Sequence, residues 1–280
     1  MVSVIVPTRN SARTLASCLA SIRAQRAVEI ELIVVDNASS DVTPNIAYGY
    51  ADVVTTRGPE RSAQRNFGAS IAKGDHLFFV DSDMVLTPNL VSECAAILIE
   101  TQAPAVIVPE VSVGQGFWAA CRALERRCYV GDDLVEAARF FRRSTFDAAE
   151  GFDEQLLGGE DWDLSARVAQ GMRLPRSVGH LIHDEGRLRL VVVLAKKRYY
   201  AGSFLAYWRK HPRLAISQAR VVRPAFFRNW KTLMRHPVLT TGVILMKVLE
   251  MSAALSVVLP EMIGHVAWRS DAEARARRMP

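Results

Sequence analysis

The sequence predicts an α/β fold built around an open, mostly parallel sheet with helices on both faces. Across roughly the first 185 residues, short apolar runs rich in β-branched residues alternate with helical patterns, which is typical of strand–helix–strand crossover units. The runs are apolar on both sides, as expected for strands that are covered on both faces. Half of the 280 residues are hydrophobic, which is enough for a full-sized buried core.

Each element of this fold follows from a local pattern. Strands are predicted where short apolar runs occur, over residues 2–7, 31–36, 53–55, 76–81, 105–109 and 138–142. Helices are predicted where apolar residues recur three or four positions apart, over residues 15–24, 43–51, 62–72, 88–101, 117–127 and 160–170. After about residue 187 the pattern changes to long helices rich in aromatic and basic residues, which predicts a separate helical region over 187–280.

Two strands of the predicted sheet end in a carboxylate. Asp36 closes the second apolar run and Asp81 closes the fourth. In an open parallel sheet, ligands bind in the crevice outside the carboxyl ends of the strands, so both side chains are expected at the ligand-binding edge. An aspartate at a strand end also serves as a helix cap, and Asp36 alone fits either interpretation.

The triplet Asp81-Ser82-Asp83 is a more specific signal. Two carboxylates this close repel each other unless a cation offsets their charge. Mg²⁺ and Mn²⁺ take oxygen ligands, commonly one or two carboxylates together with substrate phosphates. The alternative is a polar turn after a strand, but the position of the triplet on the same edge as Asp36 favours a metal site.

A second acidic cluster begins a helix. Glu160, Asp161 and Asp163 follow Gly158 and Gly159, which let a ligand approach the backbone closely. Acids in a first helical turn also stabilise the helix through its dipole, and this is the simpler explanation of the cluster. A general base needs a carboxylate beside the reacting hydroxyl and away from the metal ligands, and Asp161 is the candidate for that role.

Together these motifs resemble those of the family 2 glycosyltransferases, which are inverting enzymes of the GT-A fold. The five matching segments agree with the family in order and spacing, at residues 2–10, 31–41, 65–68, 81–83 and 151–164. The resemblance implies a GT-A catalytic domain over residues 1–186. One departure lies on the acceptor side, where Glu150-Gly151 stands in place of a Gly-Gly pair before Phe152.

The resemblance also implies roles for individual residues. Thr8, Asp36 and Arg65 would hold the nucleoside, expected to be uridine or another pyrimidine, and Asp81 would contact the ribose or the metal shell. The implied donor-binding set is Pro7, Thr8, Asn10, Asp36, Arg65, Asp81 and Ser82. The implied metal ligands for Mg²⁺ or Mn²⁺ are Asp83, Asp81 and His183. The implied acceptor-side residues are Asp161 as the base, with Glu160 and Trp162.

His183 and Trp162 each have a second interpretation. His183 lies 22 residues after Asp161, where some relatives place a histidine as a further metal ligand, and neutral imidazole is a common metal ligand. A structural histidine is the alternative, and His180 competes for the same role. Trp162 would either stack on an acceptor sugar or pack in the interior.

The two parts of the chain differ strongly in charge. Residues 1–185 hold 17 Lys and Arg against 25 Asp and Glu (net −8), whereas residues 186–280 hold 18 against 4 (net +14). Basic residues interleaved with Trp, Tyr and Phe suit a helix at a membrane interface. A helical lid with a solvated basic face is the alternative. No recognition motif for nucleic acid accompanies the basic residues, so a nucleic-acid partner is not expected.

Residues 238–259 form an apolar stretch that is long enough to span a bilayer. Lys247 and Glu250 lie in its middle, and each costs about 2.5–3.5 kcal/mol at the centre of a spanning helix. Spaced three apart, they can form an ion pair. This favours a helix that lies in the membrane interface or self-associates, which also makes a homodimer plausible. Packing against the protein and spanning the membrane are the alternatives.

The sequence therefore predicts a metal-dependent transfer of a sugar from a nucleoside diphosphate donor, expected to be a UDP-sugar, to an acceptor hydroxyl with inversion. The expected acceptor is a glycan or a lipid-linked molecule, at the cytoplasmic face of the membrane. Met1 leads directly into a predicted strand without a secretory signal, and the four cysteines show no metal-ligand spacing.

Other functions fit the sequence less well. A nucleotidyltransferase usually has a glycine-rich basic loop after its first strand, which residues 7–10 lack. A dehydrogenase requires a GxGxxG motif at that position. An inactive sugar- or nucleotide-binding scaffold would have no need of Asp83 and Asp161.

Overall fold

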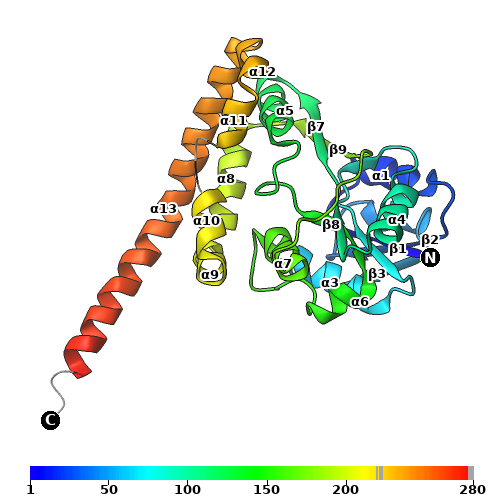
Figure 1. Ribbon diagram of the computed structural model, residues 1–280, viewed down its shortest axis with the longest axis horizontal. Helices are drawn as coiled ribbons and strands as arrows, with labels where there is room; N and C mark the ends of the chain where they lie inside the picture. The colour runs from blue at the N-terminus through cyan, green and yellow to red at the C-terminus, as the bar shows by residue number, and fades with distance from the viewer. Residues whose placement is uncertain (219, 221–222, 277–280) are drawn as a thin grey trace.

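The computed structural model describes residues 1–218, 220 and 223–276, and for 261–276 it describes the helical backbone alone. Its core is a six-stranded sheet in the order β3-β2-β1-β4-β8-β6. These strands span Val53–Thr56, Ile30–Asp36, Val2–Thr8, His76–Phe79, Ala138–Arg142 and Ala105–Ile107. The first four run parallel, and β8 runs antiparallel to both of its neighbours. The predicted α/β class with a largely parallel sheet is therefore confirmed (Figure 1).

Helices cover both faces of this sheet because successive side chains of a strand point to opposite faces. Val4 and Val6 of β1 pack with helices α1 (Leu15–Arg23) and α4 (Leu90–Thr101). Ile5, between them, packs with α3, α6 and α7 on the other face. These three helices span Arg61–Ile71, Arg143–Ala148 and Glu160–Ala169, and the short α2 spans Thr43–Tyr48.

A second, three-stranded sheet was not predicted. It consists of β5 (Met84–Leu86), β9 (Leu181–Arg187) and β7 (Glu110–Gln115), with β9 in the middle. β5 and β9 pair antiparallel with Met84 opposite His183, whereas β7 and β9 are parallel. The strands are short and carry polar residues, so their stability depends on partners far away in the sequence.

The C-terminal part is helical, as predicted. Helices α8 to α12 span Leu190–Ala201, Phe204–Lys210, Pro212–Gln218, Pro224–Arg228 and Trp230–Met234, and α13 spans Pro237–Ala276. The first part of α13 packs on α5 (Phe117–Tyr129) and α8, and its remainder extends away from the body (Figure 1). A Cβ at Gly242 would lie 2.5 Å from Sγ of Cys121, so the glycine permits the close approach of α13 to α5.

Helix α13 contains the one stretch in the described part of the chain that is long and apolar enough to cross a membrane. This stretch covers 237–260 with a mean hydropathy of 1.9, and 28% of it is buried within the protein. The predicted ion pair forms, with Lys247 Nζ 3.3 Å from Glu250, and both residues also pair with α5 through Glu125 and Arg122. One face of the helix thus packs against the protein, while Ile244 and Leu255 are among the apolar residues left exposed.

Candidate functional site

The carboxyl ends of β1 and β2 meet at Thr8 and Asp36, which are opposite each other in the register. The Thr8 hydroxyl donates to Asp36 Oδ1 at 2.8 Å, and the backbone N–H of Ser39 donates to Asp36 Oδ2 at 2.8 Å. Asp36 is only 4% exposed. Its carboxylate therefore organises the loop that follows β2. It does not cap α2, whose N-cap is Val42, and its contact with a nucleoside stays a prediction.

The other predicted donor residues at this edge support the same loop. Asn10 has a positive φ of 50°, and its backbone N–H donates to Ser39 Oγ at 2.8 Å. The Ser82 and Ser11 hydroxyls lie 2.8 Å apart, which ties the end of β4 to the loop after β1. Pro7 lies within β1, buried. The structure thus brings these residues together around the ends of β1, β2 and β4.

Arg65 has a different environment from the one predicted for it. Its side chain is 0% exposed, and Nη2 donates to Asp81 at 2.6 Å while Nη1 donates to Asp161 at 2.8 Å and to Glu160 at 3.3 Å. Arg139 donates to the other oxygen of Asp81 at 3.3 Å. Arg65 therefore joins the acidic residues of the two motifs, and in the described residues no contact links it to Thr8 or Asp36.

These ion pairs set the charge of the acids. Although burial opposes ionisation, the positive charges of Arg65, Arg139 and Arg61 hold the pKa of Asp81 well below its usual range. Both oxygens of Asp81 are engaged by guanidinium groups. Asp81 is therefore an anchor for two arginines in this structure, and within the described residues no hydrogen bond or ion pair joins it to Asp83 or His183.

Glu160 is titratable near neutral pH. Burial raises its pKa to about 7, the negative charge of Asp161 acts in the same direction, and Arg61 and Arg65 oppose both. Glu160 lies 3.3 Å from each of these arginines. Asp161 is more open, with 28% of its side chain exposed. Of the two neighbouring acids, Asp161 is thus the one that faces solvent in the cavity described below.

The stability of the protein is expected to fall as the pH rises from about 5 to about 8. Folded Glu160 keeps its proton up to a pH of about 7, whereas an unfolded glutamate releases it near 4.5. The folded state binds more protons in this range, so its free energy of unfolding decreases with pH, by on the order of 2 kcal/mol. Glu160→Gln, which mimics the protonated acid, should flatten the decline in urea unfolding experiments. An unchanged slope in this variant would contradict the assignment.

Asp83 and His183 are brought together by the pairing of β5 with β9. His183 Nε2 lies 3.2 Å from Asp83 Oδ2. Burial lowers the pKa of His183, but the hydrogen bond and negative charge of Asp83 outweigh this and raise it overall. The Nδ1 atom of His183 is buried without a hydrogen-bond partner, and Glu185 Oε1 lies 3.9 Å from it.

This pair fits a divalent cation. An imidazole nitrogen and a carboxylate oxygen side by side are common metal ligands, and 40% of the Asp83 side chain is exposed. Among the described residues, no group of three or more His, Cys, Asp or Glu is arranged to hold a metal ion. A cation here would need further ligands from a bound substrate, which is how Mg²⁺ is usually held beside phosphates.

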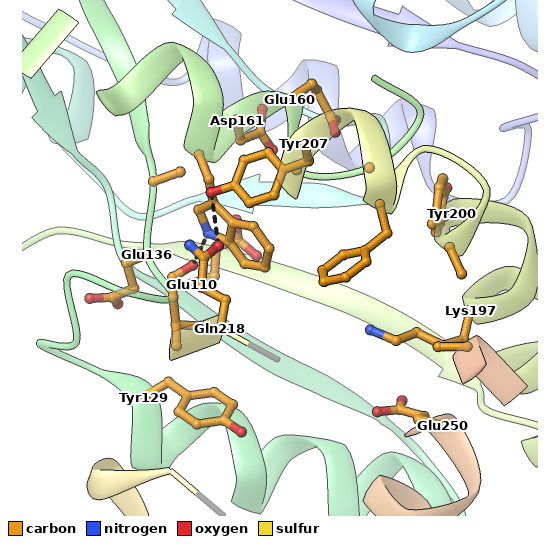
Figure 2. Close-up of a pocket in the computed structure, with 18 of the residues that line it drawn as sticks. Glu110, Tyr129, Glu136, Glu160, Asp161, Lys197, Tyr200, Tyr207, Gln218 and Glu250 are labelled. Atoms are coloured by element: carbon orange, nitrogen blue, oxygen red, sulfur yellow. Dashed lines mark hydrogen bonds between the residues drawn. The ribbon is translucent and has the colours of Figure 1, made fainter. Parts of the chain in front are cut away.

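A cavity of about 560 Å³ adjoins these residues (Figure 2). Glu160, Asp161, Trp162 and His183 line it. Its other walls come from α5, α8, α9 and α13, so it lies between the sheet and the C-terminal helices. The Trp162 indole N–H donates to the Val135 carbonyl at 2.9 Å and its ring lies 6.2 Å from that of Tyr207. Trp162 therefore both packs and lines the cavity.

Tyr200, Phe204 and Tyr207 line this cavity, a role that was not predicted for them. Tyr200 lies under the guanidinium of Arg61 at 5.3 Å, and Gly158 and Gly159 pack closely against Tyr200 and Tyr207. A signal was present in the aromatic residues of 199–208, which were interpreted as a membrane-facing belt. Helices α8 and α9 thus form walls of the cavity, and contact of the basic region with a membrane stays a prediction.

Comparisons with known proteins agree with this geometry. Residues 3–146 match the family model described as Glycosyl transferase family 2. The chain is 27% identical over 192 residues to a PGL/p-HBAD biosynthesis glycosyltransferase of Mycobacterium tuberculosis, covering 65% of this chain and 75% of the relative.

Two solved structures have a similar fold. Mannosyltransferase PcManGT from Pyrobaculum calidifontis, in complex with GDP-Man and Mn²⁺, superposes with a TM-score of 0.64 at 18% identity, covering 92% of this chain and 86% of that one. S. aureus TarS 1-349 with UDP-GlcNAc gives 0.57 at 16% identity, covering 94% and 92%. The chain spans 53% of a longer TarS structure.

Proposed function

The chain belongs to glycosyl transferase family 2, and from this premise we propose that it transfers a sugar from a nucleoside diphosphate donor to an acceptor hydroxyl in the cavity. The single observation that carries the proposal is the position of Asp161. Its carboxylate lines the same cavity as His183, one of the two candidate metal ligands. One cavity therefore reaches a candidate base and a candidate metal ligand, which supports a transfer between a donor and an acceptor bound there.

Asp161 is proposed to act as the general base. Its oxygen takes the proton of the acceptor hydroxyl, and the acceptor oxygen forms a bond to the anomeric carbon of the sugar. The bond from that carbon to the diphosphate breaks on the opposite face, so the nucleoside diphosphate leaves and the configuration inverts. Arg65 holds one Asp161 oxygen at 2.8 Å, which leaves the other oxygen of the carboxylate for the acceptor.

Asp83 and His183 are proposed to hold Mg²⁺ or Mn²⁺. A cation bound there offsets negative charge on the diphosphate as it leaves. Ser82 and Asn10 lie on the loops beside this pair, where the donor is proposed to bind together with Thr8 and Asp36. The similar structures contain donors with different bases, UDP-GlcNAc and GDP-Man, so both bases are tested. A UDP-sugar is the donor expected from the sequence.

The donor site is tested by isothermal titration of UDP, GDP, dTDP and CDP, each with and without Mn²⁺. One diphosphate is expected to bind in a metal-dependent manner, and Asp83→Ala should weaken that binding about tenfold or more, which corresponds to about 1.4 kcal/mol. Asp75→Ala is the matched control, because Asp75 lies beyond the other end of β4 and its side chain is 85% exposed. Folded protein that binds none of the four would favour an inactive scaffold.

The enzyme is further proposed to act as a peripheral protein at the cytoplasmic face of the membrane, on a lipid-linked or membrane-bound acceptor. The net charge of +14 over 186–280 and the exposed apolar face of α13 support this. Co-sedimentation with anionic liposomes at low salt is expected, and about 0.5 M salt should release the protein because surface charges are then screened. Protein that stays in the supernatant at low salt would contradict membrane binding.

A further inference from the structure

The part of the cavity wall that the C-terminal region supplies carries surplus positive charge. Lys197 of α8 and Arg220 and Arg223, which follow α10, belong to it. Within the described residues, none of the three has a carboxylate partner. Arg223 donates to the Gln218 carbonyl at 2.7 Å and lies over the ring of Tyr129, while its buried Nε atom has no acceptor.

The acids in this region are already neutralised. Glu125 and Glu250 pair with Arg122 and Lys247, so this group of four has no net charge. Lys197 lies beside this group. Burial is the main cause that lowers the pKa of Lys197, and the positive charges of Lys247, Arg223 and Arg122 lower it further, whereas the negative charge of Glu250 raises it. Figure 2 shows the amine of Lys197 extending from α8 into the cavity near Glu250, on the opposite side from Asp161.

An apolar wall adjoins these cations. Met251, Ala254, Leu255 and Val258 of α13 line the same cavity, from the residue after Glu250 to about two turns beyond it. They follow the spacing of one helix face. Leu255 is 40% exposed. The cavity thus offers a carboxylate base at one side, unpaired cations at the other, and a hydrocarbon surface leading away from the cations.

We propose that this part of the cavity binds a phosphate group attached to an apolar chain. The phosphate lies between Lys197 and Arg223, which supply charged donors to its oxygens, and the chain runs along α13 from Met251 to Val258. A free Arg and Lys without a carboxylate partner are the groups that phosphate binding uses. A neutral lipid would leave both cations unpaired.

Two sources supply such a group, namely the phosphate of a lipid-linked acceptor and the headgroup of a membrane phospholipid. Assigning the phosphate to a lipid-linked acceptor rests on the proposed function, because that function places the acceptor hydroxyl near Asp161. The existence of a phosphate site does not depend on the proposed function. Binding is therefore measured without a donor, and titration with UDP on the same protein reports separately on the donor site.

Isothermal titration measures the binding of three probes. They are a twelve-carbon alkyl phosphate below its critical micelle concentration, the matching alkyl alcohol and inorganic phosphate. The alkyl phosphate is expected to bind at least about tenfold more tightly than either other probe, since a charge-assisted hydrogen bond contributes that much. Lys197→Gln and Arg223→Gln should each remove most of the preference over the alcohol. Lys196→Gln is the matched control, because Lys196 is the preceding residue on α8 and does not line the cavity.

Equal binding of the phosphate and the alcohol would overturn the proposal, as would a preference that persists in both cavity variants. If inorganic phosphate bound as tightly as the alkyl phosphate, the apolar wall would contribute nothing to binding, and that part of the proposal would be wrong. Phosphatidylglycerol vesicles distinguish the sources. Displacement of the alkyl phosphate by the vesicles assigns the site to a membrane headgroup, and retention assigns it to a lipid phosphate that enters as a single molecule.

Discussion

Asp161→Asn is expected to lower the rate of sugar transfer about 10³-fold while donor binding changes by less than about twofold. General base catalysis typically contributes 10²–10⁴-fold, and the amide cannot accept the proton. The substitution is nearly isosteric, and the Asn oxygen can still accept from Arg65, whose Nη1 lies 2.8 Å from Asp161. The measurement is the turnover number with a fixed acceptor, together with titration of the nucleoside diphosphate.

Two comparisons make this result specific. Asp147→Asn removes an exposed carboxylate on α6 that does not line the cavity, and it should retain the full rate. Glu160→Gln separates the two neighbouring acids, because Glu160 is buried and its pKa is raised to about 7. A full loss of rate in Glu160→Gln with a retained rate in Asp161→Asn would transfer the role of base to Glu160.

Arg65→Met is expected to lower the free energy of unfolding by about 3–5 kcal/mol. The Arg65 side chain is fully buried and contacts Asp81, Asp161 and Glu160. Removing one partner of a buried ion pair leaves uncompensated charge, and here several carboxylates lose the same partner. Arg65→Lys should lower the free energy of unfolding by less than Arg65→Met. The lysine keeps the positive charge but lacks the two terminal nitrogens with which the guanidinium group contacts different acids.

Arg13→Met is the matched control in the same urea or thermal unfolding series. Arg13 pairs with Asp184 at 2.6 Å, but the two side chains are 60% and 39% exposed. A surface pair of this kind contributes at most about 1 kcal/mol. If Arg65→Met were no less stable than Arg13→Met, the buried arginine would not be what holds the acidic motifs together.

The strands of the main sheet could be predicted to within about two residues because most of them are short apolar runs buried on both faces. β1 and β2, for example, have the buried patterns that their sequences indicated. The second sheet could not be predicted in this way. β9 contains the polar segment His183-Asp184-Glu185, and its strand conformation comes from pairing with β5 and β7 rather than from its own pattern.

Some parts of the candidate site could likewise be predicted from the sequence, and others could not. Asp83 and His183 were expected to lie together from the resemblance to a family, and the structure brings them to 3.2 Å. The position of Arg65 had no local signal, because its partner Asp161 lies 96 residues away. The basic C-terminal helices were expected to present their charge to a membrane. A charge count does not say which way a side chain points. Lys197 and Arg223 line the cavity, and contact of this region with a membrane stays a prediction.

The pairing of β5 with β9 has a consequence for the time at which the protein matures. The two candidate metal ligands are 100 residues apart, and His183 reaches Asp83 only after β9 has joined β5. At a synthesis rate of about 5–20 residues per second, a growing chain carries Asp83 for roughly 5–20 s before His183 exists. The proposed metal site can therefore form only late in biosynthesis, when β9 closes the small sheet.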